Sequence, residues 1–491
     1  MASKWNWRKL GYGSGAAVAA ISTVFALKST DRDKAACDND ELKPSNKLQL
    51  TKSKVLTTPS PETTVHNFIN ASNRAHREEN LNVAIQESRK LCKRLKNQLG
   101  LPGLTVGVSV NGKMMWQEGF GFANIENNVK MQPEQVMRIA SISKSMTMAM
   151  MGQLMEQGKI DIDKPIQTYL PSYPEKVFDG EKVTITTRHL LSHLSGIRHY
   201  IKKEDELDEK SPNKCSKCKA QEEMEIVGEF FLKDNFSSVE DSMKLFQNDE
   251  LYHKPGTKYF YTTHGWTVVS AVIEKLTETS FPKHAKKMFD MWGLENTYLD
   301  QHEPIIYNRA SYYTRRNYGE IINAPYVDNS YKWAGGGFLS NVADLSQFAN
   351  ILLYSMQTPE GSPTFCAKGL PKTPYLKQST MQTMWTGNPA TARPPSDNLY
   401  GLGFVVGEPL RKCMFCKERD IMTVNHSGGA MGASSILLLA FPKNKLNTCD
   451  SEKSSETTEV KGVVVAMITN LSAVSLSKTA QEIANNFRIL I

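Results

Sequence analysis

The sequence predicts an α+β fold, in which an antiparallel sheet is flanked by helices and interrupted by an inserted, mostly helical lobe. Three observations support this prediction: a helix and a β-hairpin signal come first, a helical and loop-rich block follows from about Thr186 to Ala390, and short aliphatic strands close the chain. Because strands occur at both ends, we expect the first and last parts to share one sheet, with the helical block as a second lobe.

The first predicted elements are an amphipathic helix and a hairpin. Apolar residues recur at helical spacing over residues 77–99, which is typical of a helix with one buried face. Apolar residues then alternate over 104–110 and around 113–119, on either side of Asn111-Gly112. Alternation around Asn-Gly is a strong hairpin signal, because these residues accept the positive φ angles of a tight turn.

A second helix is predicted over residues 141–157, and it is dense in methionine. Methionine fills irregular core gaps, so a buried helix is favoured over a methionine-rich metal site. The end of the chain is predicted as short strands at 400–407, 422–426, 434–441 and 463–469, followed by a helix at 477–489.

The chain is expected to contain a leading segment, a linker and one globular domain. Residues 1–28 combine basic residues with the uncharged run from Leu10 to Leu27, which predicts a targeting segment or a membrane anchor. A mitochondrial presequence, a secretory signal and a single anchor all remain open on this evidence. Residues 29–75 are predicted as a polar linker and residues 76–491 as the globular domain, with a charged insertion at 201–250.

Composition excludes several classes of protein. The 491 residues include 40% hydrophobic and 22% charged residues, unlike collagen, a disordered polymer or a multi-span membrane protein. The formal net charge is +8. No single stretch concentrates this charge, so it predicts no nucleic-acid partner.

The first chemical motif is Ser141-x-x-Lys144 at the start of the second predicted helix. At positions i and i+3 the two side chains share one helix face. A neutral lysine amine there could take the serine proton, and the helix N-terminus would favour an oxyanion nearby. Alone the motif is weak, since Ser-x-x-Lys also occurs by chance in ordinary helices.

Two later patterns strengthen this interpretation. Tyr261 lies in a polar run before a predicted helix, and His426-Ser427-Gly428-Gly429 lies ahead of a strand. The order Ser-x-x-Lys, Tyr-x-polar, basic-Ser/Thr-Gly resembles the superfamily of serine β-lactamases and penicillin-binding proteins. The resemblance implies a β-lactamase/transpeptidase-like fold and covers the chain from about His76 to its end.

Stretches longer than these motifs also resemble the family. Those at 333–337 and 400–404 resemble members related to class C β-lactamases, and those at 193–200 and 326–332 resemble an animal, mitochondrial branch. That resemblance implies a mitochondrial serine peptidase, in the intermembrane space, that influences lipid metabolism and assembles into filaments. The stretches are His193-Leu194-Ser195-Gly196-Ile197-Arg198-His199-Tyr200, Trp333-Ala334-Gly335-Gly336-Gly337, Tyr326-Val327-Asp328-Asn329-Ser330-Tyr331-Lys332 and Tyr400-Gly401-Leu402-Gly403-Phe404.

The resemblance also implies a role for each motif residue. Ser141 would be the nucleophile that forms an acyl-enzyme, and Lys144 its general base. Tyr261 would pass a proton to the leaving group and later activate water. The backbone N–H groups of Ser141 and Gly429 would form the oxyanion hole. The substrate would pair with the strand edge at His426, Ser427 and Gly428.

Two positions depart from the bacterial pattern. The third motif begins with His426 where many members have lysine, and histidine is mostly neutral at pH 7. Thr263 replaces the usual asparagine of the second motif, so a side-chain amide that would hold substrate is lost. Both changes argue against β-lactams or D-Ala peptides and favour another acyl group, such as an ordinary peptide bond.

Metal sites are the other candidates. His189, His193 and His199 lie close together in sequence, although structural histidines are the commoner explanation for that spacing. Two Cys-x-x-Cys pairs would suit one structural zinc if the insertion folds back over the cleft; reduced thiols or disulfides are the alternative. Catalysis itself requires no cofactor. The tentative zinc ligands are Cys215, Cys218, Cys413 and Cys416.

The motifs, together with the family that they resemble, thus imply a serine hydrolase that forms an acyl-serine intermediate; the resemblance also implies a peptide or protein substrate and self-assembly. An esterase or amidase would use the same chemistry. The alternative from another class is a filament-forming scaffold with a vestigial active site. Membrane association through the leading segment, and a secretory location, are further alternatives.

Overall fold

The computed structural model describes residues 61–200, 228–316, 319–361, 373–407, 421–443 and 460–491. The leading segment predicted at 1–28, and most of the predicted linker, lie outside these ranges. The chain divides into two compact units, Met1–Thr64 and Val65–Ile491, and the second unit contains all of the described strands. Within the described residues, no helix has the length and apolarity that a membrane crossing requires.

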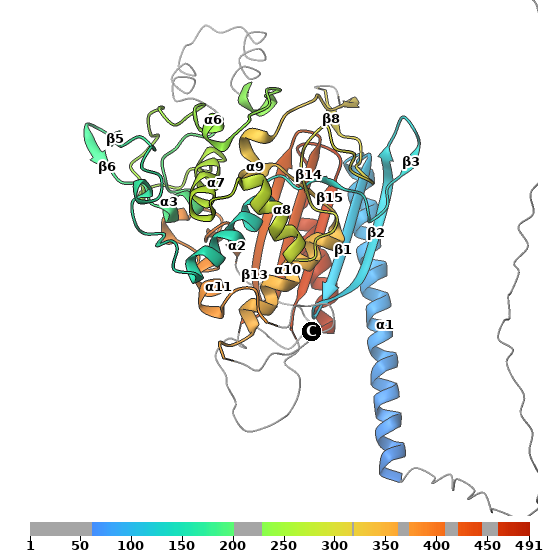
Figure 1. Cartoon of the computed structure of the whole chain (residues 1–491). Helices are drawn as coiled ribbons and strands as arrows, with labels where there is room; N and C mark the ends of the chain where they lie inside the picture. The colour runs from blue at the N-terminus through green and yellow to red at the C-terminus, as the bar shows by residue number, and fades with distance from the viewer. Residues whose placement is uncertain (1–60, 201–227, 317–318, 362–372, 408–420, 444–459) are drawn as a thin grey trace, which may run out of the picture. The chain divides into compact units, whose positions relative to one another are not determined.

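An eight-stranded antiparallel sheet forms the centre of the second unit (Figure 1), in the order β11-β12-β13-β14-β15-β1-β2-β3. Strand β1 from the start of the domain pairs with β15 from its end, so that Val106 lies opposite Met467. The expected sheet shared by both ends of the chain is confirmed. The strands are β1 (Gly103–Val110), β2 (Lys113–Asn124), β3 (Val129–Lys130), β11 (Leu399–Tyr400), β12 (Val405–Gly407), β13 (Ile421–Ala430), β14 (Ala433–Pro442) and β15 (Val463–Thr469).

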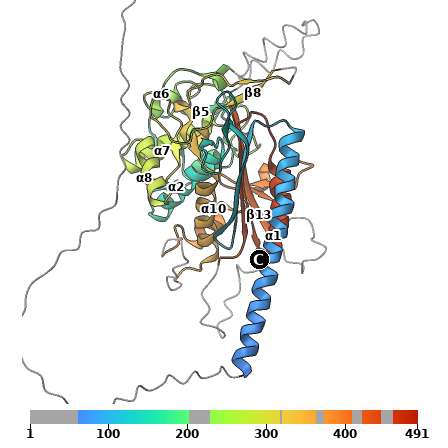
Figure 2. The ribbon, with the colours of Figure 1, turned by 90° about the vertical axis from the view of Figure 1, so that its right-hand side faces the viewer.

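Helices cover both faces of this sheet, as Figure 2 shows. Helices α1 (Pro61–Gln98) and α12 (Ser477–Phe487) lie on one face, and α10 (Val342–Gln357) lies on the other. Successive side chains of a strand point to opposite faces, and β15 follows this rule. Val465 packs into the core beneath α1 and α12, whereas Ala466 packs into the core that α10 shares. A central strand buried on both sides explains its continuous aliphatic sequence.

The predicted hairpin and methionine-rich helix are both present. Asn111 and Gly112 have φ angles of 52° and 77°, as a two-residue turn with two left-handed positions requires. Helix α2 (Ile142–Glu156) is buried along nearly its whole length. Its fillers Met146, Met148, Met150 and Met151 are each 0% exposed, which confirms the buried helix.

Helix α1 starts earlier than predicted. It begins at Pro61 rather than near residue 77, and proline suits the first position of a helix. Ala84, Ser88 and Cys92 on its later part are buried at i, i+4 and i+8. Residues 74–79 are all exposed, so this turn has no buried stripe. The periodicity that located the later helix is therefore missing here, and α1 extends through residues 61–75, which the sequence analysis assigned to the linker.

Two strand predictions need adjusting. The run predicted as one strand at 400–407 is two short strands, β11 and β12, because the backbone turns at Gly403, whose φ is +71°. Strand β13 extends to Ala430, so the His426 motif lies within the strand rather than ahead of it.

The helical lobe inserted between β3 and β11 contains most of the remaining elements. Besides α2 and α10, its helices are α3 (Thr187–Leu191), α6 (Val239–Met243), α7 (His264–Thr277), α8 (Phe281–Met291), α9 (Trp333–Gly336) and α11 (Gln378–Met384). Short 3-10 turns lie at Ile166–Thr168, Gly228–Phe231, Ser330–Lys332 and Pro389–Thr391. A further 3-10 turn, Arg488–Leu490, follows α12 outside the lobe. Its small sheets are β4 (Met137–Arg138) with β10 (Phe338–Ser340) and β7 (Tyr298–Leu299), β5 (Lys176–Phe178) with β6 (Glu181–Val183), and β8 (Tyr313–Arg315) with β9 (Ile321–Asn323).

The described end of the predicted insertion belongs to the core. Met243 and Phe246 are buried in the main hydrophobic cluster, although their segment is rich in charged residues. Glu229 accepts hydrogen bonds from the guanidinium of Arg198 at 2.7 Å and lies 2.8 Å from Nε2 of His264. The Arg198 side chain is 2% exposed and also contacts Asp249. This ion-pair network attaches the segment that begins at residue 228 to the rest of the helical lobe.

Replacing Glu229 tests this attachment. Glu229→Ala should lower the free energy of unfolding by about 3 kcal/mol, because it leaves the buried Arg198 without one of its carboxylates. The matched control is Glu250→Ala, an exposed glutamate with no ion pair among the described residues, which should change stability by less than about 0.5 kcal/mol. Equal denaturant midpoints for the two variants would contradict the role of Glu229.

The same ion-pair network also makes the stability of the protein depend on pH in the acid range. Burial alone would raise the pKa of Glu229, but hydrogen bonds from His264 and Arg198 lower it from 4.5 to about 2. The stabilisation is therefore complete above pH 4.5 and is lost as the pH falls toward 2. Glu229→Ala should flatten this part of the stability curve.

Candidate active site

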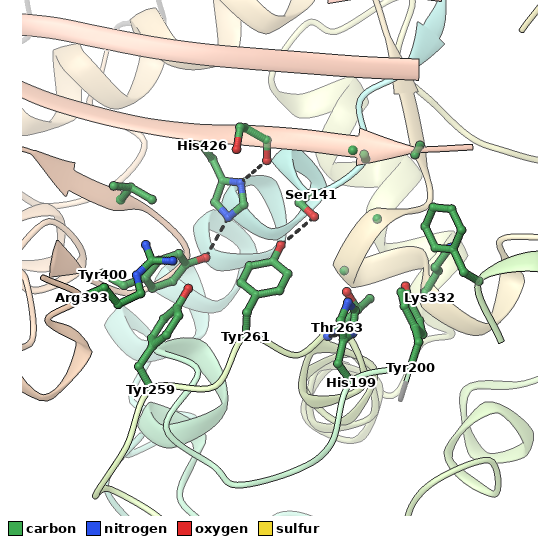
Figure 3. A pocket seen from close by; sticks show the side chains of 18 residues that line it. Ser141, His199, Tyr200, Tyr259, Tyr261, Thr263, Lys332, Arg393, Tyr400 and His426 are labelled. Carbon is green, nitrogen blue, oxygen red and sulfur yellow. Dashed lines mark hydrogen bonds between the residues drawn. The ribbon is translucent and has the colours of Figure 1, made fainter. Parts of the chain in front are cut away.

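Most of the predicted catalytic and substrate-binding residues line a cavity of about 280 Å³ between strand β13 and the helical lobe; Lys144 and Gly428 lie behind this lining. Figure 3 shows Ser141, Tyr261, Thr263 and His426 facing this space. Its lining includes the cations Lys332 and Arg393 and no aspartate or glutamate among the described residues. The cavity is therefore a polar, cationic cleft.

Ser141 follows a residue with an unusual backbone. Ala140 has a φ of +49°, which is costly for a residue with a β-carbon and is often found beside catalytic groups. Its neighbour Ile139 is held on both sides: its N–H donates to Phe338 O at 3.1 Å, and its carbonyl accepts from Ser435 Oγ at 2.8 Å. These two hydrogen bonds and the turn at Ala140 hold Ser141 at the start of α2, with its hydroxyl at the cavity.

Lys144 lies one turn along α2 and is fully buried. Its Nζ is 3.0 Å from Ser141 Oγ, 2.5 Å from Gly335 O and 3.3 Å from Thr263 Oγ1. Burial lowers the pKa of Lys144 well below 10.5, and the charge of Lys332 lowers it further. In its neutral form this amine has two N–H groups, which can serve Gly335 and Thr263, and one lone pair, which is then left for the Ser141 hydroxyl.

Tyr261 approaches Ser141 from the other side. Its hydroxyl donates to Ser141 Oγ at 2.7 Å. Burial raises the pKa of Tyr261 above its ordinary value of 10, so it stays a phenol that can donate a proton. The ring of His193 packs against it with centroids 4.2 Å apart, and His193 Nδ1 accepts from the backbone N–H of Thr262 at 3.1 Å. His193 thereby fixes the segment that carries Tyr261.

His426 is held as a neutral ring. Its Nδ1 lies 2.7 Å from Ser427 O and its Nε2 lies 2.8 Å from the hydroxyl of Tyr400. With Nδ1 donating to the carbonyl and Nε2 accepting from Tyr400, both nitrogens have partners. Burial lowers the pKa of His426 to about 3. The structure thus gives this motif no standing positive charge, as the sequence predicts.

The last part of β13 borders the cleft. Its neighbour β12 pairs only with residues Thr423–Asn425, so Ser427 and Gly429 lie beyond that pairing and line the cavity. Gly428 makes the close approach: a β-carbon there would lie 2.3 Å from Ile139 O and 2.3 Å from Ser435 Oγ. A β-carbon on Gly429 would meet nothing within 4 Å. Of these two glycines, only Gly428 is sterically required for β13 to reach the segment before Ser141.

Thr263 contacts the lysine rather than standing free at the cavity wall. Its hydroxyl is one of the partners of Lys144, and its backbone N–H donates to His199 Nδ1 at 3.2 Å. Its hydroxyl thus forms part of the polar surroundings of the Lys144 amine.

The three neighbouring histidines do not form a metal site. Each directs Nδ1 to a different backbone N–H: His189 to Thr186, His193 to Thr262 and His199 to Thr263. Among the described residues no group of three or more metal-ligating side chains gathers. The structural explanation of these histidines therefore fits the geometry.

Cys215, Cys218, Cys413 and Cys416 all lie outside the described residues. The structural zinc suggested for them stays a prediction. The leading segment and its membrane association likewise stay predictions.

Sequence reasoning missed several residues of the cavity. Lys332 and Arg393 bring its two unpredicted charges, and Phe230 enters it from the end of the predicted insertion. Lys332 lies within a stretch that resembles the family, but nothing in the local pattern distinguishes it from a surface lysine. Arg393 lies in a proline-rich loop without any signal.

Comparison with solved structures shows the same fold elsewhere. EstCE1, described as a hydrolase with promiscuous acyltransferase activity, aligns with a TM-score of 0.59 at 18% identity, over 82% of this chain and 99% of that one. The octameric penicillin-binding protein homologue from Pyrococcus abyssi aligns with a TM-score of 0.58 at 20% identity, over 81% of this chain and 76% of that one.

Comparison of sequences identifies the family. The human protein named "Serine beta-lactamase-like protein LACTB, mitochondrial" is 40% identical over 446 residues, which cover 82% of this chain and 80% of the human one. The family model described as Beta-lactamase matches residues 88–485. With the Ser-x-x-Lys geometry and the sheet topology, these matches show that the chain belongs to the beta-lactamase family of serine hydrolases.

Proposed function

We propose that this protein hydrolyses its substrate through an acyl-serine intermediate on Ser141. The observation that carries the proposal is the position of Ser141 Oγ, 3.0 Å from the Lys144 amine and 2.7 Å from the Tyr261 hydroxyl. Burial favours the protonation states that the reaction needs, which are a neutral amine at Lys144 and a neutral phenol at Tyr261.

In acylation, Ser141 Oγ attacks the substrate carbonyl and its proton passes to the Lys144 lone pair. The carbonyl oxygen becomes negatively charged and accepts hydrogen bonds from the backbone N–H groups of Ser141 and Gly429. As the scissile bond breaks, the Tyr261 hydroxyl donates its proton to the leaving group and regains one from the Lys144 ammonium. The amine is then neutral again, and the acyl group remains on Ser141.

In deacylation, the same groups work in the opposite order. A water molecule attacks the ester carbonyl and loses a proton toward Tyr261, which passes its own proton on to Lys144. Collapse of the second tetrahedral intermediate returns this proton to Ser141 Oγ and releases the acid. The proton transfers balance, and they need no metal or cofactor group.

We further propose a peptide or protein as the substrate. The neutral His426 supports this because a free β-lactam carboxylate would find no lysine at that point of the strand. The free part of β13 supports it because an extended peptide can add to an exposed strand edge. An esterase or amidase acting on smaller substrates would use the same groups, and EstCE1, described as a hydrolase with promiscuous acyltransferase activity, shares the fold.

The cellular setting is part of the proposal. The human relative carries a mitochondrial name, and basic residues followed by the uncharged run from Leu10 to Leu27 suit a targeting segment. We therefore propose a mitochondrial location, in the intermembrane space, and an influence on lipid metabolism. Self-assembly, as filaments, is supported by the octameric state named for the Pyrococcus abyssi homologue.

A fluorophosphonate probe tests whether Ser141 is a nucleophile. The probe should label Ser141, lose the label in Ser141→Ala and label Lys144→Met much more slowly, as mapped by peptide mass spectrometry. Because the pKa of Lys144 is lowered, the labelling rate should reach its plateau well below the ordinary lysine value of 10.5. A folded protein that resists labelling at every pH would instead favour the filament scaffold with a vestigial site.

Tyr261→Phe tests the proton transfer. Removing only the hydroxyl should slow turnover by roughly 10²–10⁴, the size of a lost general acid–base group. The control is Tyr173→Phe, which removes a buried hydroxyl outside the cavity and should leave the rate nearly unchanged. If the two variants turn over a chromogenic ester or peptide at the same rate, Tyr261 has another role.

Gly428 and Gly429 form a matched pair for the oxyanion geometry. Gly428→Ala should abolish probe labelling or slow it by roughly a hundredfold, because its β-carbon would push Ile139 and Ala140, and with them Ser141, away from β13. Gly429→Ala keeps the N–H and meets no neighbouring atom, so labelling should continue. Similar labelling rates in the two variants would contradict this geometry.

A further inference from the structure

Arg138 is a buried arginine three residues before Ser141, and the proposed reaction steps do not involve it. It lies in β4, where its backbone pairs with Leu339 of β10. Its side chain is 8% exposed. Burial acts against the charge of the guanidinium, but Asp300 and Tyr312 raise the pKa of Arg138 above its ordinary value. The side chain is therefore a buried cation next to the segment that leads to the nucleophile.

The guanidinium contacts three partners that come from different parts of the chain. Its Nε donates to Asp300 Oδ2 at 2.6 Å, and one of its terminal nitrogens donates to Met431 O at 2.7 Å. Its Cζ lies 4.4 Å from the ring centroid of Tyr312. The Tyr312 hydroxyl in turn accepts from the backbone N–H of Arg138 at 3.2 Å. Asp300 and Tyr312 thus fix the guanidinium, and the guanidinium holds the carbonyl of Met431.

Met431 belongs to the tight turn that joins β13 to β14, two residues beyond Gly429. Gly432 in this turn has a φ of +79°, and a β-carbon on it would lie 2.3 Å from Cβ of Tyr312. The N–H of Gly432 donates to Ser472 Oγ at 2.6 Å, which ties the turn to the segment after β15. The carbonyl of Met431 ties the same turn to the segment that leads into α2.

Residues 138 and 139 contact this part of the sheet on either side of Gly429, the second proposed oxyanion donor. Ile139 O approaches the glycine before it so closely that a β-carbon there would lie 2.3 Å away. Arg138 bonds the carbonyl of Met431, on the other side. Consecutive Cα atoms have a fixed separation, so a displacement of Met431 also displaces the N–H of Gly429.

We propose that Arg138 is a positioning residue of the oxyanion hole. By holding Met431 O, it sets the distance between the backbone N–H groups of Ser141 and Gly429. This role rests on the proposed function, since it concerns the same two donors. Arg138 lies outside the described lining of the cavity and acts on the reaction through these donors. A misplacement of about 1 Å can slow a reaction by about a hundredfold, so a contact outside the cleft controls the rate.

A pair of phosphorylating reagents tests the position of the donors. Ser141 Oγ displaces fluoride from diisopropyl fluorophosphate and from its P=S analogue, but sulfur is a weak hydrogen-bond acceptor. The parent protein should therefore prefer the P=O reagent more strongly than free hydroxide ion does. Arg138→Met should slow labelling by the P=O reagent about tenfold to a hundredfold and leave the rate with the P=S reagent nearly unchanged. A general loss of structure would instead lower both rates together.

Arg138→Met also leaves the buried carboxylate of Asp300 without its cation, which destabilises the fold. The second variant, Arg138→Met/Asp300→Asn, removes both charges and should show the same reduced preference. Asp300→Asn alone keeps the bond from Arg138 to Met431 O, so it should keep the preference even though its denaturant midpoint is lower. Arg89→Met is the matched control, because Arg89 pairs with Glu118 where α1 meets β2. It should leave both labelling rates unchanged.

Several outcomes would overturn the positioning role. These are an unchanged preference in the variants that lack Arg138, an equal fall of both rates, loss of the preference in Asp300→Asn, or failure of both Arg138 variants to fold. A parent protein that prefers the P=O reagent no more than hydroxide ion does would overturn it as well. Each of these results leaves the hydrolase in place, provided that the parent is labelled at Ser141. A folded parent that neither reagent labels would remove the hydrolase, and the positioning role with it.

Discussion

The arrangement of the cleft depends on the exclusion of water from the amine of Lys144. Lys144 is fully buried where α2, α7 and α9 meet, and burial is the main reason why it can be neutral. A carboxylate beside it would restore the positive charge, and the described lining of the cleft has none. The burial of α2, its methionine filling and the carbonyl of Gly335 therefore act together on one group. They lower the cost of a neutral Lys144 amine, which is the form that the proposed general base requires.

The charges of the cleft are displaced from where the bacterial motif puts one. The strand position is neutral because His426 is desolvated and bonded at both nitrogens, one of them to Tyr400. Positive charge lies instead at Lys332 and Arg393, which come from the helical lobe and a loop beside β11. The sheet thus supplies backbone hydrogen-bonding groups at the cleft, and the rest of the chain supplies the charges. Such a division lets recognition change while the acyl-transfer geometry stays constant.

Local patterns predicted what depends on local geometry. Ser141 and Lys144 share a helix face by their spacing alone, and the hairpin at Asn111-Gly112 follows from its turn residues. The sheet shared by both ends followed from the order of the strands. Lys332 and Glu229 could not be recognised, because their importance comes from burial against residues that are distant in sequence. From sequence alone, the charged segment that carries Glu229 is expected to be exposed to solvent. Only the structure shows that its partner Arg198 is buried.

The pairing of β1 with β15 also governs when the chemistry can begin. A chain leaving the ribosome exposes Ser141 and Lys144 long before Gly429, and domains of this size fold as units. Until the last strands are made, β1 lacks its partner and Gly429, the proposed oxyanion donor, is absent. An unfinished chain therefore carries the proposed nucleophile without the strand that would complete its site. The pairing closes a very long loop, which slows folding, and the proposed chemistry has to wait for the whole domain.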